Sequence, residues 1–132
     1  MQKTLIIIKP DGVKRKLIGE IIKRIERKDF NIVEAKLMVP SEDLVKEHYK
    51  EHYEKIFYNE LMEFFTSGKV MAIVVEGENA IAIMRSLVGE TDPLSAKPGT
   101  IRGDYASSKT QNIVHASDSV ESADREIKLW FG

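Results

Sequence analysis

Apolar residues recur along this chain with two spacings, one typical of strands and the other of helices. Residues 3–9 form a short β-branched run that predicts a buried strand, and the tripeptide PDG at 10–12 favours a turn that ends it. Over residues 17–25, leucine and isoleucine fall at helical spacing with charged residues between them, which predicts a one-sided amphipathic helix. Residues 31–39 alternate apolar and polar side chains, so a second strand follows.

The rest of the chain continues this succession of strands and helices. Ser41 is placed to cap a helix that begins in SEDLVKEHY. Further along, the pattern predicts a helix over 57–65, a strand over 70–76, a helix over 79–87 capped by Asn79, a strand over 113–116, and a last helix with a capping box at Asp118 and Glu121. No repeat or linker interrupts the series, so we expect a single domain over 1–132.

The order of these elements predicts an α+β fold. Two β-α-β units separated by further helices form the split βαβ pattern of ferredoxin-like domains. In that fold a four-stranded antiparallel sheet is covered by helices, here expected on one face. Because the same fold supports enzymes, regulators and RNA binders, it does not decide the function.

Composition narrows the classes of partner and location. The 132 residues, 42% of them hydrophobic, suffice for one globular core. With 20 basic and 21 acidic residues there is no global field that would attract nucleic acid or an anionic membrane. The absence of cysteine excludes disulfides and thiolate metal sites and fits a reducing compartment, so we expect the cytoplasm. The apolar run at 5–8 is too short for a signal sequence or a membrane span.

One long polar stretch and one histidine provide the candidate chemistry. Residues 89–109 show little apolar periodicity, and loops of this length in compact domains are usually functional or disordered. Arg85, just before the stretch, and Arg102, within it, could bind phosphate through their guanidinium groups, although either could be a solvated surface charge. His115 follows an apolar pair and, taken alone, could be a half-buried structural histidine.

Three segments resemble the nucleoside diphosphate kinase family closely and in order. They are IIIKPDGV near the start, GETDPLSAKPGTIRGDY in the long stretch and NIVHASDSVESADREIKLWF at the end, with HY at 48–49 and SG at 67–68 between them. The resemblance spans essentially the whole chain. It implies a ping-pong enzyme that moves the γ-phosphoryl group of a nucleoside triphosphate to a nucleoside diphosphate through a phosphohistidine. It also implies Mg²⁺ as cofactor and a homo-oligomer built from dimers, for which we expect a hexamer rather than a tetramer. Nucleotides are the expected partners, not nucleic acid or membrane.

The same resemblance implies roles for individual residues. His115 matches the nucleophile, since a neutral imidazole nitrogen attacks phosphorus near pH 7. Glu126 matches the partner of the other ring nitrogen, and Ser117 a neighbour of the ring. The implied nucleotide-binding set consists of Lys9 at the transferring phosphate and the sugar, Tyr49 near the phosphates and the nucleophile, Phe57 under the base, Arg85, Thr91 and Arg102 on the phosphates, and Asn112 on the ribose.

Other interpretations stay open at this point. Lys9 could be a charge that ends a strand, and Phe57 could be a core aromatic. A nucleotide-binding module without turnover would have little reason to keep His115 together with Glu126. An RNA-binding ferredoxin-like domain predicts a basic sheet face with exposed aromatics, which TLIIIK at 4–9 does not provide.

The sequence contains no evident metal cage. Mg²⁺ is expected to be held mainly by nucleotide phosphates and water, with Glu51 and Asp118 as candidates for outer contacts. His48 and His52 lie four residues apart on a predicted helix, which is a possible metal spacing, but a third ligand is missing and we expect solvated histidines. The segment 50–59 departs from the family wording, which leaves the base-binding helices less well defined than the chemistry.

Overall fold

The computed structural model describes residues 1–50 and 58–132. Its elements, in chain order, are β1 (Gln2–Ile8), α1 (Pro10–Lys14), α2 (Ile18–Arg27), β2 (Asn31–Met38), α3 (Glu42–His48), α4 (Tyr58–Phe65), β3 (Val70–Gly77), α5 (Ala80–Val88), α6 (Ile101–Tyr105), β4 (Val114–Ala116) and α7 (Val120–Phe131). Every predicted strand is present within a residue or two of its expected bounds. The residues Glu51, His52 and Phe57 lie outside the described part of the chain.

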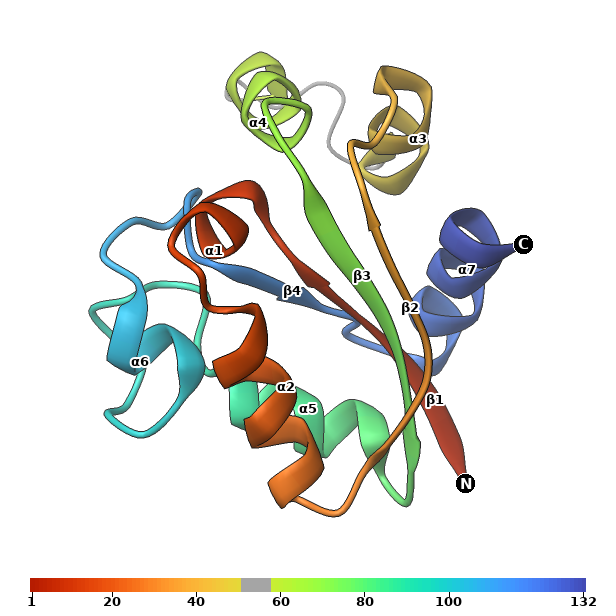
Figure 1. The fold of residues 1–132 in the computed structure, drawn as a ribbon, viewed down its shortest axis with the longest axis vertical. Helices are drawn as coiled ribbons and strands as arrows, with labels where there is room; N and C mark the ends of the chain where they lie inside the picture. The colour runs from red at the N-terminus through yellow and green to blue at the C-terminus, as the bar shows by residue number, and fades with distance from the viewer. Residues whose placement is uncertain (51–57) are drawn as a thin grey trace.

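The four strands form one antiparallel sheet in the order β2-β3-β1-β4 (Figure 1). β1 is central, and this explains its unbroken apolar run, because a strand that is buried on both faces has no polar side. Ile6 and Ile8 pack with residues of α2 and α5. Leu5 and Ile7 pack on the opposite face, with residues of α3, α4 and α7.

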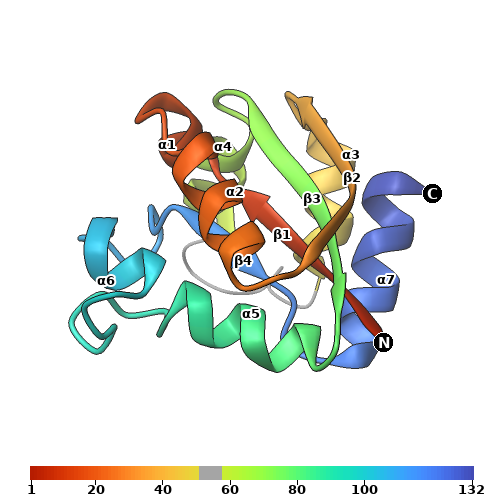
Figure 2. The same cartoon turned by 60° about the horizontal axis from the view of Figure 1, so that its bottom comes forward.

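Helices therefore cover both faces of the sheet, and the expectation of one covered face is wrong. In Figures 1 and 2 the strands run between α2 and α5 on one side and α3 and α7 on the other. The physical reason lies in β1 and β3, which expose apolar side chains to both faces, so that each face needs a covering layer. None of the described helices combines the length and apolarity required to cross a membrane.

Two short helices occupy segments for which only turns or loops were expected. The tripeptide at 10–12 opens α1, where Pro10 sits in the first turn and its missing N–H costs no hydrogen bond. Within the long polar stretch, Thr100 caps α6 by accepting a hydrogen bond of 2.9 Å from the Gly103 N–H. The stretch is thus ordered around a helical turn.

The predicted helix caps have mixed outcomes. Ser41 caps α3 as expected, by accepting from the Leu44 N–H at 3.1 Å. Asn79 occupies the cap position of α5, but it adopts a left-handed φ of 53° and its side chain makes no capping bond. The capping box at Asp118 is wrong, because α7 starts later and Ser119 caps it by accepting from the Ser122 N–H.

Candidate active site

β4 directs His115 toward the sheet face that α3 and α7 cover. Val114 and Ala116 pack in the cluster on the α2 and α5 side. Side chains alternate along a strand, so His115 between them points to the other face. The register agrees, since His115 lies opposite Ile7, whose side chain packs on that same face.

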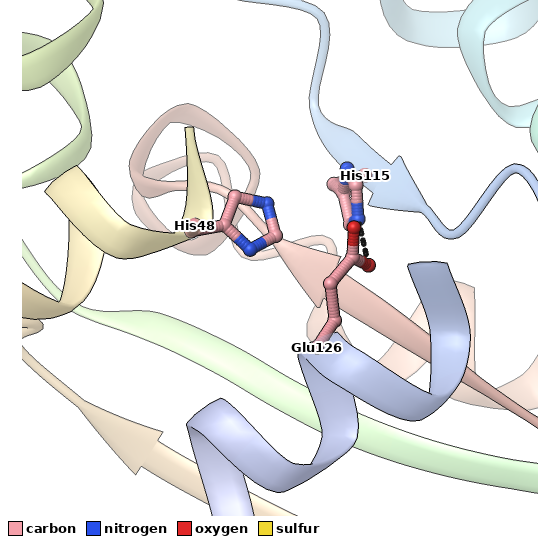
Figure 3. A group of neighbouring side chains, drawn as sticks. All are labelled: His48, His115 and Glu126. Carbon is pink, nitrogen blue, oxygen red and sulfur yellow. Dashed lines mark hydrogen bonds and ion pairs between the residues drawn. The ribbon is translucent and has the colours of Figure 1, made fainter. Parts of the chain in front are cut away.

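Glu126 of α7 meets this histidine in the interior. Nε2 of His115 lies 2.8 Å from Oε1 of Glu126 (Figure 3). The Ser117 hydroxyl donates to the same oxygen at 2.7 Å. An ionised carboxylate only accepts hydrogen bonds, so Nε2 carries the proton and the lone pair of a neutral ring is on Nδ1. Ser117 is fully buried and acts on His115 through Glu126.

A buried lysine and asparagine lie at the end of β1. Nζ of Lys9 donates to Oδ1 of Asn112 at 2.8 Å, and both side chains are buried. Nδ2 of Asn112 donates in turn to the carbonyls of Lys109 and Thr91. Burial, assisted by the charge of Arg102, lowers the pKa of Lys9 from 10.5 to about 7. An anionic ligand next to Lys9 would favour its charged form.

The two arginines are held differently. Arg102 is buried and donates to three backbone carbonyls, those of Asn112, Gly89 and Val114. Arg85 is exposed and donates to one carbonyl, that of Ala116, at 3.2 Å. Burial and the nearby Arg85 lower the pKa of Arg102 to about 10, which leaves it cationic at neutral pH. Three of the five guanidinium donors of Arg102 therefore bind the backbone around the site.

The backbone just before β4 is strained. Ile113 adopts a φ of 77°, and a 2.8 Å hydrogen bond joins the carbonyl and N–H of its two neighbours, as in a γ-turn. This conformation is unfavourable for a β-branched residue, and such strain clusters at functional sites. The segment at 9–12 holds it, because the Lys9 N–H donates to the Ile113 carbonyl and Asp11 accepts from the Ile113 N–H at 3.0 Å. The tripeptide PDG predicts a turn from the sequence alone, and nothing in it indicates this contact with Ile113.

Most of the predicted site residues line one cavity of about 390 Å³. Those that the structure brings together there are Lys9, Tyr49, Arg85, Thr91, Arg102, Asn112, His115, Asp118 and Glu126. Burial raises the pKa of the Tyr49 hydroxyl, and the charge of Glu126 raises it further, so the phenol is protonated. Phe57 and Glu51 lie outside the described residues. The cavity is thus rich in cations and hydrogen-bond donors, and it can bind a polyanion beside a nucleophilic nitrogen.

His48 also lines the cavity, and its position was not predicted from the sequence. It was expected to be solvated, but it is 5% exposed and its Nδ1 lies 3.1 Å from the indole Nε1 of Trp130. Trp130 is 82 residues away in the sequence, so no local pattern could reveal this partner.

The described residues contain one group of side chains with the geometry to hold a metal ion. Among the described residues, one group of metal-ligating side chains is close enough to share an ion, namely His48, His115 and Glu126, within 4.8 Å of one another. These three side chains are already engaged in hydrogen bonds, since His115 binds Glu126 and His48 accepts from Trp130. Asp118 fits an outer contact better, because it is exposed beside the cavity and a hydrogen bond from the Ser122 side chain lowers its pKa.

Comparisons with known proteins agree over the length of the chain. The family model described as nucleoside diphosphate kinase matches residues 2–132. The nucleoside diphosphate kinase of Macrococcus caseolyticus is 60% identical over 131 residues, which cover 99% of this chain and 88% of the relative. That of Rubrobacter xylanophilus is 56% identical over 132 residues, covering 100% and 99%. The crystal structure of nucleoside diphosphate kinase from Encephalitozoon cuniculi is similar with a TM-score of 0.98 and 45% identity, covering 100% of this chain and 90% of that one.

Proposed function

This chain belongs to the nucleoside diphosphate kinase family, and from this premise we propose that its phosphotransferase activity runs through a phosphohistidine on His115. The resemblance found in the sequence and the ferredoxin-like fold are both confirmed. The observation that supports the role of His115 most strongly is its 2.8 Å bond to Glu126 through Nε2, with the ring lining a cation-rich cavity. A histidine with a purely structural role would not need both the bond to Glu126 and a place in the cation-rich cavity.

In the first half-reaction, the Nδ1 lone pair of His115 attacks the γ-phosphorus of a nucleoside triphosphate. A phosphorus–nitrogen bond forms while the bond from the γ-phosphorus to the bridging oxygen breaks, and the diphosphate leaves with that oxygen. Positive charge develops on the ring, and the carboxylate of Glu126 balances it through the Nε2–H. In the second half-reaction a different nucleoside diphosphate attacks the phosphohistidine, and the same steps run in reverse.

The cations of the cavity stabilise the charge on the transferring group. Lys9, Arg85 and Arg102 lie around the cavity that contains His115, and phosphoryl transfer depends mainly on positioning and charge stabilisation. Tyr49 can donate its phenol proton to a phosphate oxygen. Asn112 and Lys9, which bind each other in the free protein, are available for the sugar hydroxyls.

The base contact and the metal stay predictions. Phe57 would stack on the base, and stacking does not discriminate strongly among bases. We expect Mg²⁺ to arrive with the nucleotide, held by phosphate oxygens and water, with Asp118 as an outer contact. When bound, the ion would neutralise phosphate charge. Equilibrium dialysis of Asp118→Asn with Mg²⁺ and a non-hydrolysable triphosphate would test that contact.

We also expect a homo-oligomer, and the sheet offers a surface for it. β2 is an edge strand, and on and beside it Val33, Leu37 and Val39 are 42%, 48% and 57% exposed. An exposed apolar edge strand favours association with another chain. A hexamer rather than a tetramer is our prediction, and light scattering on purified protein distinguishes them. The cytoplasmic location likewise stays a prediction, which cell fractionation tests.

The decisive experiment is incubation with γ-labelled ATP in the absence of an acceptor. The label should transfer to the protein and survive base but not acid, as a phosphohistidine does. His115→Ala should abolish labelling, whereas the matched control His52→Ala should retain it. Labelling that survives in His115→Ala would place the nucleophile elsewhere, and nucleotide binding without any labelling would indicate a binding module.

A further inference from the structure

A second histidine lies directly beside the proposed nucleophile. The ring centroids of His48 and His115 are 4.6 Å apart, with the planes at 76°, so the two rings meet edge to face. Figure 3 shows the ring of His48 at the end of α3 turned toward His115 and Glu126. Glu126 fixes only the Nε2 end of the His115 ring, so a second contact is needed to limit its tilt.

The contact with Trp130 favours the neutral form of His48. An indole N–H can only donate, so Nδ1 of His48, 3.1 Å away, must be an unprotonated acceptor. The neutral ring then carries its proton on Nε2. A second proton on Nδ1 would face the indole N–H and break this bond. Because both side chains are buried, water cannot replace the lost partner without rearrangement.

The charge of His48 matters because Glu126 is close to it. Among residues 1–50 and 58–132, the groups that face His48 include Glu126, Arg125 and Trp130 from α7, His115 from β4, Phe65 from α4, and the adjacent Tyr49. Arg125 donates to the His48 backbone carbonyl at 3.3 Å. A cationic His48 would therefore attract the Glu126 carboxylate and compete with His115 for it. A neutral His48 leaves that carboxylate bound to the nucleophile.

We propose that His48, held neutral by Trp130, is a positioning residue that supports the His115 ring and keeps Glu126 bound to it. The proposal rests on the proposed function, because it takes His115 as the nucleophile. His48 touches neither substrate nor the transferring group in this role. It acts through the orientation of His115, so its effect belongs in the rate of phosphorylation more than in nucleotide affinity.

The test is Trp130→Phe, which keeps an aromatic ring and removes the N–H donor. With the donor gone, no indole N–H opposes a second proton on Nδ1 of His48, so the cationic ring becomes more populated at pH 6 than at pH 8. We expect single-turnover phosphorylation within about twofold of wild type at pH 8, and an additional loss of more than about twofold at pH 6. We define the pH ratio as the phosphorylation rate at pH 8 divided by the rate at pH 6. Because other groups titrate alike in both proteins, a difference in this ratio between the variant and wild type reports on His48.

Phe131→Leu, a change of the neighbouring aromatic on α7, is the matched control and should keep the wild-type pH ratio. If Trp130→Phe has the same pH ratio as wild type, the inference is overturned while the proposed function stays intact. Failure of wild type to label His115 would instead overturn the proposed function. An independent readout that needs no variant is ¹⁵N NMR of the histidines in the wild-type protein. His48 should remain neutral with Nε2 protonated from pH 8 to pH 6, and a cationic His48 at pH 6 would contradict the proposal.

Discussion

At the level of single residues, the two arginines of the cavity differ in what they hold before any nucleotide binds. Arg102 donates to three backbone carbonyls and Arg85 to one. Both should stabilise the transition state, so alanine at either position should lower kcat/KM for every nucleotide. The expected loss of transition-state stabilisation is on the order of a few kcal/mol. Only Arg102→Ala should also lower the free energy of unfolding, by about 1–3 kcal/mol, because it leaves buried carbonyls without donors. Steady-state kinetics and urea unfolding of the two alanine variants would measure both effects. Equal losses of stability in the two variants would contradict the difference expected between Arg102 and Arg85.

Lys9 gives the free protein a pH-dependent stability. Its pKa is lowered from 10.5 to about 7 in the fold, so between those values the unfolded chain binds more protons than the native state. The free energy of unfolding therefore rises with pH across this window, and the contribution is unfavourable below about pH 7. Wild type should gain more stability between pH 6 and pH 10 than Lys9→Met does. Urea unfolding at both pH values measures the difference, with the exposed Lys69→Met as a control that should follow wild type.

Some of these residue-level features could be predicted and others could not. The match to His115 and Glu126 could be read from the order of the motifs, because they come close together in one segment. The burial of His48 could not, since its partner Trp130 reaches it only after α7 folds over the sheet. The backbone contacts of Arg102 were also hidden, because a sequence does not show which carbonyls a long stretch will expose.

At the level of elements, strands were easier to predict than caps and short helices. β1 and β3 are marked by long apolar runs, which sheet burial requires. α1 and α6 have five residues each, too few for helical periodicity to become visible, and proline and glycine in them indicate turns. The two covered faces were missed because a continuous apolar run shows that a strand is buried but not which helix lies on each side.

α1 and the turn before β4 depend on a glycine. A Cβ added to Gly12 would lie 2.8 Å from Cγ2 of Ile8 and 2.9 Å from the carbonyl oxygen of Ile113. Gly12→Ala should therefore displace the strained turn, cost about 1–3 kcal/mol of stability, and lower the rate of phosphorylation. Gly19→Ala in α2 is the matched control, because a Cβ there meets nothing within 4 Å. Thermal unfolding should show the control neutral or stabilised by up to about 1 kcal/mol, and a neutral Gly12→Ala would refute the role of the turn.

At the level of the whole molecule, buried groups from separate elements form the part of the cavity in which we propose that the sugar and phosphates bind. Lys9 comes from the end of β1, Arg102 from α6, and Asn112 from the segment before β4. The proposed base contact is a single stacking face. The enzyme should thus tolerate different bases and discriminate against changes in the sugar.

Turnover of adenine, guanine, cytosine and uracil diphosphates should differ modestly, because stacking is worth about 1–3 kcal/mol and every base can stack. A nucleotide that lacks its 3′-hydroxyl should be a poorer substrate, because unpaired groups left in a closed site cost about 1–3 kcal/mol each. Coupled assays on the four diphosphates and one 3′-deoxy analogue measure both effects. Strong preference for one base, combined with indifference to the 3′-hydroxyl, would contradict this description of the cavity.

The central claim is that His115 attacks through the nitrogen that Glu126 leaves open, and the position of the phosphoryl group tests it most directly. Protein labelled with ¹⁵N-histidine, phosphorylated with a nucleoside triphosphate and examined by NMR, reveals which ring nitrogen is bonded to phosphorus. Because Nε2 is bound to Glu126 at 2.8 Å, we predict phosphorus on Nδ1 of His115, with the proton still on Nε2. Phosphorus on Nε2, or on His48 or His52, would contradict the account.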